Sequence, residues 1–145
     1  IIWPALLIYQ LMKKVGALDE IQNKFRSLSE SRILQLLIVG WVFPSFLQGV
    51  TGFGTPVAVT APLLLGMGFS PLIAATTPLI GHAWAVTFGS LGSSYHAARL
   101  VTELNPAQSA GFANWAALLL SITCLLTGFS IAFLYKGLKE VFQPH

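Results

Sequence analysis

The chain has 145 residues, of which 54% are hydrophobic and 9% are charged, and its formal net charge is +3. A soluble domain carries about 25% charged residues, whereas here residues 33–98 contain no Asp, Glu, Lys or Arg and residues 100–135 contain only Glu103. Uncharged stretches longer than about 18 residues predict membrane-spanning helices. We therefore expect a lipid bilayer as a partner, with the basic residues beside membrane segments and no nucleic acid partner.

Residues 1–12 are apolar and are followed by Lys13 and Lys14. They are too few to cross about 30 Å of hydrocarbon, and a signal peptide would carry its basic residues before the apolar run. We interpret them as the end of a transmembrane helix and the chain as a fragment of a larger membrane protein. Residues 13–32 hold five basic and three acidic side chains. By the positive-inside rule they are expected to form a cytoplasmic loop.

Residues 33–68 are apolar, but their helical pattern is broken. One continuous helix over them would measure about 54 Å at 1.5 Å per residue, too long for a single crossing. The break comprises Thr51, Gly52, Phe53, Gly54 and Thr55, and Pro56 follows it. A threonine before a proline is typical of a helix start. We expect two helical arms that meet here. They form either a re-entrant hairpin, which we favour because both basic flanks stay cytoplasmic, or a full span followed by a half-span.

The rest of the chain predicts two further membrane helices. Ser70 and Pro71 have the signature of a helix start, so we expect a transmembrane helix over residues 70–91, kinked at Pro78. Residues 92–110 are more polar and are expected to form a loop, and residues 111–135 are expected to form the last transmembrane helix. The predicted fold is an all-α, polytopic membrane bundle with a re-entrant or broken helix around residues 51–56.

The break at residues 51–56 is a candidate substrate site. Unsatisfied backbone polar groups are not tolerated in lipid, so a broken helix lies inside protein or beside a water-filled cavity. A helix that begins at Pro56 presents free N–H groups and the positive end of its dipole, which suits a small carboxylate. Transporters place such half-helix ends near the bilayer midplane. The alternative is that Gly52 and Gly54 only permit close helix packing.

A second loop of glycines and hydroxyls comprises Gly89, Ser90, Gly92 and Ser93. It follows an apolar segment, as the first loop does. The two loops are candidates to converge on one ligand. The alternative is an ordinary polar turn between helices.

His82 is a titratable side chain deep inside an apolar segment. Ionisable residues within membrane spans are functional candidates by default, and histidine changes charge near neutral pH. His82 is therefore a candidate for coupling proton movement to transport. The alternative is a neutral histidine that is hydrogen-bonded between helices. The sequence contains no Walker motif, no HExxH motif, no cysteine cluster and no pair of aspartates in a span, so we expect neither an enzyme nor a bound cofactor or metal.

The segments FLQGVTGFGTPVAVTAPLLLGMGFSPL and LIGHAWAVTFGSLGSS resemble the lactate permease family of carboxylate transporters. The resemblance implies about a dozen or more transmembrane helices in the cell membrane, of which this chain would supply about a quarter. It also implies import of lactate, or in some cases glycolate, with protons. The expected function is secondary transport of a small 2-hydroxymonocarboxylate by proton symport. The alternative is a channel or a non-transporting membrane component.

Three positions depart from the family pattern. Members often carry a glutamate where Gln48 stands, an asparagine where His82 stands, and a proline after the second loop where Ser93 and Ser94 stand. A glutamine cannot exchange a proton near neutral pH as a glutamate can. If the family couples transport through that glutamate, the coupling group here differs, and Gln48 and His82 are the two positions at which we look for it.

Overall fold

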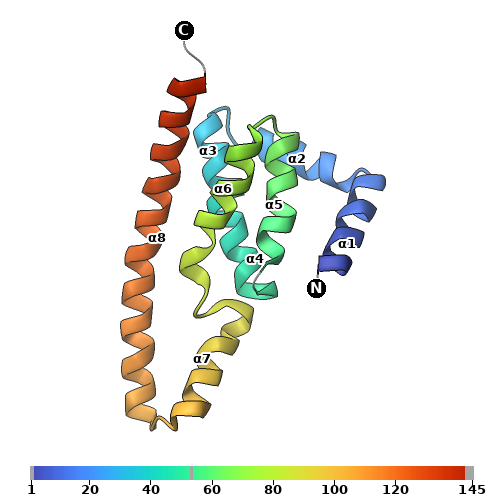
Figure 1. The fold of residues 1–145 in the computed structure, drawn as a ribbon. Coiled ribbons are helices and arrows are strands. Elements are labelled where there is room, and N and C mark those ends of the chain that lie inside the picture. The colour runs from blue at the N-terminus through green and yellow to red at the C-terminus, as the bar shows by residue number, and fades with distance from the viewer. Residues whose placement is uncertain (1, 53, 143–145) are drawn as a thin grey trace.

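The computed structural model describes residues 2–52 and 54–142, and these residues form helices joined by short turns (Figure 1). In chain order the helices are α1 (Ile2–Lys14), α2 (Ala17–Ser27), α3 (Arg32–Leu37), α4 (Phe43–Thr51), α5 (Thr55–Gly66), α6 (Pro71–Gly81), α7 (Gly89–Thr102) and α8 (Pro106–Phe142). A π-helical turn at Ile38–Val42 joins α3 to α4, and a 3₁₀ turn at Ala83–Ala85 follows α6. No strand occurs in the described part of the chain.

Within the described residues, two helices are long and apolar enough to cross a membrane. They are Arg32–Thr51, which combines α3, the π-helical turn and α4, and Pro106–Gly137 of α8. A third candidate is the pair Pro71–Ala85 and Gly89–Thr102, which is bent by 45°. Helix α5 is apolar but shorter. The predicted all-α membrane bundle with a broken helix around residues 51–56 is thereby confirmed.

The chain reverses direction at the break. Helices α4 and α5 pack against each other, and in Figure 1 α3 and α4 run down while α5 runs back up beside them. Gly52 and Gly54 have φ angles of 80° and 91°, a region that glycine enters without steric cost. The N-cap residue of α5 is Gly54. The sequence pattern predicted Thr55 at that position, but Thr55 is already the first helical residue.

Helix α6 crosses the π-helical turn at very short range. A Cβ atom on Gly81 would overlap the carbonyl oxygen of Gly40 and would lie 2.9 Å from the Cα of Trp41. Ser45 lies one turn further along and directs its hydroxyl at the carbonyl oxygens of Trp41, at 2.6 Å, and Gly81, at 3.0 Å. Small residues at these positions let the two backbones approach, which is a common way to pack helices in membranes.

The hydrophobic core lies between the two arms of the hairpin, α6 and α8. Its fully buried side chains include those of Leu36, Val39, Leu63, Leu64 and Ile131. Much of α8 is exposed on its apolar side, as Leu119, Leu125 and Phe129 illustrate. This is expected of a helix that faces lipid or other parts of a larger membrane protein.

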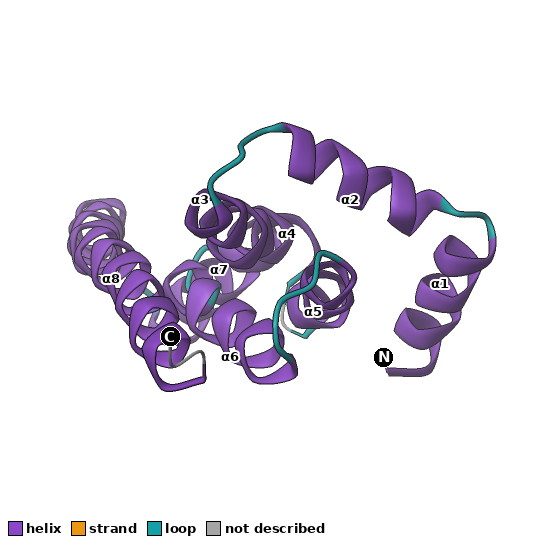
Figure 2. Ribbon diagram, turned by 90° about the horizontal axis from the view of Figure 1, so that it is seen from above, coloured by secondary structure: helices purple, strands orange, loops and turns teal. Residues whose placement is uncertain are grey.

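Two basic side chains hold the end of the hairpin opposite the break. Arg26 donates to the carbonyl of Gly66 at 2.5 Å, and Arg32 donates to the carbonyls of Met67 at 2.9 Å and Gly68 at 3.2 Å. Helix α2 thereby lies across this end, and α1 continues beside α5 (Figure 2). The sequence predicted a loop over residues 13–32, but α2 occupies 11 of these residues. The reason is that its apolar residues, Leu18, Ile21 and Phe25, recur at helical spacing and pack on the core.

The second expected loop, over residues 92–110, is also mostly helical, since α7 continues to Thr102 and α8 begins at Pro106. The segment is polar by local standards, but beyond Gly92 and before Pro106 it contains no further glycine or proline to end a helix. The turn between the two helices is set by a reciprocal cap. The Oδ1 of Asn105 accepts from the N–H of Gln108 at 2.9 Å, and the Oε1 of Gln108 accepts from the N–H of Asn105 at 3.1 Å.

Candidate anion site at the helix break

The two glycine loops meet in space. Helix α4 packs against the start of α7, and a Cβ atom on Gly52 would overlap the Oγ of Ser90. On the neighbouring turn, a Cβ atom on Gly89 would lie 2.8 Å from the Nε2 of Gln48 and 3.1 Å from its carbonyl oxygen. The sequence placed the loops some 40 residues apart. The fold brings Gln48, Gly52, Gly89 and Ser90 into one cluster, which we call the loop junction.

The second loop is a left-handed turn. Ser90, Leu91 and Gly92 have φ angles of 51°, 56° and 78°. A left-handed conformation costs a residue other than glycine about 1–2 kcal/mol, and such strain tends to persist at functional sites. The turn interrupts the helical path between Gly89 and the regular part of α7, and it places Ser90 against Gly52.

The first turn of α5 holds the backbone N–H groups that the sequence analysis predicted as donors to a carboxylate. Its N-terminus has no side-chain cap among the described residues, and the first backbone bond recorded there runs from the N–H of Ala58 to the carbonyl of Gly54, at 3.5 Å. The N–H groups of Thr55 and Val57 precede that bond, and helices leave such groups without an internal partner. Gly54 is exposed, and an added Cβ atom would meet open space. The backbone at Gly54, just before these N–H groups, is therefore open.

The remaining residues that were predicted in the two loops lie in different environments. The hydroxyl of Thr51 is exposed and donates to the carbonyl of Leu47 at 2.8 Å within α4, so it is engaged in its own helix. Thr55 is half-buried at the start of α5. Phe53 lies outside the described residues. Ser93 is exposed in the helical part of α7, and the described contacts do not join it to the first loop.

Gln48 is buried in the loop junction, with 2% of its surface exposed. Its carbonyl oxygen accepts from the N–H of Gly52 at 3.1 Å. Its side-chain Oε1 is buried and has no hydrogen-bond donor among the described residues. Sequence reasoning considered Gln48 only as a departure at a coupling position and did not anticipate this acceptor. The one available signal was a strongly polar side chain within an uncharged run.

The indole N–H of Trp84 is a second buried polar group. Its indole Nε1 has no acceptor among the described residues, and the same holds for the Nε1 of Trp41. Trp41 packs its ring on α8, where a Cβ atom on Gly128 would lie 2.8 Å from it. Tryptophan N–H groups usually find a partner when buried.

His82 lies at the end of α6, and 5% of its surface is exposed. Its Nδ1 lies 2.6 Å from the carbonyl oxygen of Pro78, so Nδ1 carries the proton in that bond. The adjacent Gly81 packs on Gly40, which is eight residues, or about 12 Å of helix, from Gln48. His82 therefore sits near the site but not at the loop junction.

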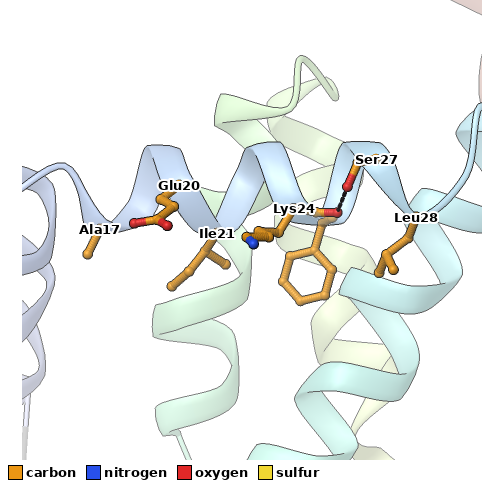
Figure 3. A pocket seen from close by; sticks show the side chains of 7 residues that line it. Ala17, Glu20, Ile21, Lys24, Ser27 and Leu28 are labelled. Atoms are coloured by element: carbon orange, nitrogen blue, oxygen red, sulfur yellow. Dashed lines mark hydrogen bonds between the residues drawn. The ribbon is translucent and has the colours of Figure 1, made fainter.

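A pocket of about 430 Å³ lies elsewhere, beneath α2, and Figure 3 shows the side chains that line it. Ile21 and Leu28 project from the helix into this space, and Ser27 bonds the carbonyl of Lys24 at 2.7 Å. Helix α2 packs near Gly66, at the end of α5 away from the loop junction. The mainly apolar lining does not suit a carboxylate. Among the described residues, no group of three or more His, Cys, Asp or Glu side chains is placed to hold a metal ion.

Comparison with known proteins identifies relatives over nearly the whole chain. The family model described as L-lactate permease matches residues 1–144. The L-lactate permease of Salmonella typhi is 38% identical over 140 residues, and that of Escherichia coli (strain K12) is 36% identical over 140 residues. Glycolate permease GlcA of the same E. coli strain is 37% identical over 142 residues. Each match covers 97% of this chain.

The chain spans about a quarter of the length of these relatives, since 25% of each of them is covered. No solved structure matches it. The relatives are named as permeases, which are transporters and not enzymes, and the apolar helices are those of a multi-pass protein of the cell membrane. The match over residues 1–144 shows that the chain belongs to the L-lactate permease family.

Proposed function

We propose that the full-length protein is a secondary active transporter of lactate, glycolate or a related small 2-hydroxymonocarboxylate. In this proposal the loop junction and the first turn of α5 form part of the substrate site. Thr55 and Val57 donate their backbone N–H groups to the carboxylate, and the hydroxyl of Ser90 lies beside them. The names of the relatives support the substrate class. The observation that carries the site is that the described residues supply no side-chain cap to the N-terminus of α5, while the left-handed turn of the second loop packs on Gly52, just before the same break.

The positions of the charged residues support a break that lies deep in the membrane, toward the face opposite Arg32. Arg32 begins a helix of 20 residues that ends at the break, a distance of about 30 Å. Beyond the loop junction, Arg99 lies in the last turn of α7. In Figure 1, α7 and the lower part of α8 extend past the turn between α4 and α5. We propose that this turn is the tip of a re-entrant hairpin and that Arg32 lies at the cytoplasmic face.

Uptake by the full-length protein tests the transport proposal. Proteoliposomes that contain it should accumulate labelled lactate or glycolate above the external concentration when an inward proton or sodium gradient is imposed. A channel would only equilibrate the substrate, and a non-transporting component would take up neither lactate nor glycolate. Either of these results would refute secondary active transport.

Proton symport is the finer part of the proposal, with His82 as the coupling group. It is a buried titratable side chain near the site, and its Nδ1 donates to the carbonyl of Pro78. Gln48 occupies the other predicted coupling position, but a carboxamide does not exchange a proton near neutral pH. We assign Gln48 a different role below.

A further inference from the structure

We propose that Gln48 is the residue that selects for the 2-hydroxyl group of the substrate, by accepting a hydrogen bond from that hydroxyl at its Oε1. This inference rests on the proposed function, because it assigns the hydroxyl to Gln48 and the carboxylate to the first turn of α5. It makes Gln48 a specificity determinant.

The buried Oε1 of Gln48 has an energetic cost when no donor is bound to it. Gln48 is 2% exposed, and its Oε1 has no donor among the described residues. A buried acceptor without a donor loses its hydration and gains nothing in return, and native structures contain few such groups. A substrate that brings a donor to this oxygen removes that penalty when it binds.

The amide of Gln48 lies close to the break between α4 and α5. The carbonyl of Gln48 accepts from the N–H of Gly52, and its Nε2 end packs on Gly89. The amide therefore lies one helical turn before the break and is confined between α4 and the start of α7. The donors of α5 begin just beyond the same break. The amide of Gln48 and the donors of α5 thus flank the same break, and the proposal places the ligand between them.

A ligand with a hydroxyl group beside its carboxylate is complementary to these protein groups. An ionised carboxylate has acceptors only, so it cannot satisfy Oε1, whereas a hydroxyl group can donate. In a 2-hydroxymonocarboxylate the two groups are on adjacent carbons, so one small molecule presents both within a few ångströms. An amide is also neutral and does not repel the carboxylate, as a second carboxylate would. The complementary ligand is a monocarboxylate with a hydroxyl at C2.

This arrangement predicts discrimination against acids that lack the hydroxyl. A site that hydrogen-bonds a substrate hydroxyl strongly rejects analogues without it, because the buried protein group is then left unpaired, whereas a merely apolar pocket discriminates weakly. Propionate and 2-fluoropropionate are suitable probes. Both retain the carboxylate, and fluorine occupies about the space of a hydroxyl without its proton.

The experiment measures uptake of labelled lactate by proteoliposomes of the full-length protein, in competition with propionate and 2-fluoropropionate. Wild-type protein should prefer lactate over either analogue by at least about tenfold. In Gln48→Met, which keeps the length of the side chain and removes the amide, the preference should fall about tenfold or more through weaker recognition of lactate. Competition by the two analogues should change little.

Gln35→Met is the matched control. Gln35 is also a buried glutamine of the same helical arm, but its Nε2 donates to the carbonyl of Ser29 at 2.8 Å and its Oε1 accepts from Arg32 at 3.3 Å. Its replacement should lower thermal stability without changing the preference for lactate. An unchanged preference in Gln48→Met, or an equal change in Gln35→Met, would overturn the assignment.

The wild-type measurement tests the inference even if the Gln48 variant does not fold. If wild-type protein accepts propionate or 2-fluoropropionate as well as lactate, the hydroxyl is not recognised and the inference is wrong. If it takes up neither lactate nor glycolate, the proposed function itself fails. The two failures are therefore distinguishable.

Discussion

The two ends of α5 treat their backbone polar groups in opposite ways. At the C-terminal end, the carbonyls of Gly66, Met67 and Gly68 receive donors from Arg26 and Arg32. At the N-terminal end, no side chain of the described residues caps the first turn. Both ends face the same problem, since a helix leaves backbone groups unpaired at each terminus. Arginine side chains supply the partners at the C-terminal end, and we propose that the substrate carboxylate supplies them at the N-terminal end.

This contrast predicts that the loop junction tolerates the least change. Gly52→Ala would place a Cβ atom against Ser90 Oγ at a φ of 80°. We expect lactate uptake to fall about a hundredfold, since a displacement of about 1 Å at a reacting or binding group has that order of effect. Gly111→Ala is the control, because Gly111 lies in α8 with open space around it. Its uptake should stay near wild type, and equal losses in both variants would remove the special role of the junction.

The same overlap can be relieved from the other side. Ser90 has a φ of 51°, so Ser90→Gly removes the clashing hydroxyl and also suits the backbone. The double variant Gly52→Ala/Ser90→Gly should therefore recover part of the uptake that Gly52→Ala loses. A double-mutant cycle on uptake rates measures this coupling. Strictly additive losses would show that the two loops act independently.

The arginine end should affect stability more than transport. Arg32→Ala removes two donors to the end of α5 as well as the guanidinium that lies 4.3 Å from the ring centroid of Phe69. We expect a loss of about 1–2 kcal/mol in the free energy of unfolding and less than a threefold change in KM for lactate. Thermal unfolding of the purified protein measures the first quantity. A large rise in KM with unchanged stability would contradict the division of roles between the two ends.

The smallest expected effect on total uptake concerns His82. In His82→Asn the side-chain amide can still donate to the Pro78 carbonyl, but it cannot titrate. Downhill lactate flux should persist, whereas stimulation by an inward proton gradient should be lost. If the variant keeps its full response to the gradient, coupling belongs to another group and His82 is a structural cap of α6.

Part of this architecture could be predicted from the sequence. Glycine and proline disrupt helices for steric reasons that act locally, so Gly52, Gly54 and Pro56 were sufficient to place the break and the start of α5. The long apolar stretches likewise predicted membrane helices, because an uncharged helix of 18 or more residues is long enough to cross the hydrocarbon layer and has no charged face to present to water.

Other features depend on tertiary contacts and were not predictable in the same way. Gly89 and Gly92 indicated a loop, but Ser90 and Leu91 adopt a left-handed conformation that residues other than glycine rarely enter, so their residue types gave no sign of that conformation. The polarity of residues 92–110 suggested a loop, but polarity does not prevent a helix when breakers are few. The unpaired Oε1 of Gln48 became visible only once α7 was packed against α4.

The central claim is that the substrate carboxylate binds the backbone N–H groups at the start of α5. Solid-state NMR on the full-length protein in lipid, with ¹³C-carboxyl lactate and ¹⁵N-labelled threonine and valine, measures this contact directly. The account predicts dipolar coupling from the carboxyl carbon to the amide nitrogens of Thr55 and Val57, absent in Gly52→Ala. Saturated binding of lactate with no coupling to either nitrogen would contradict it.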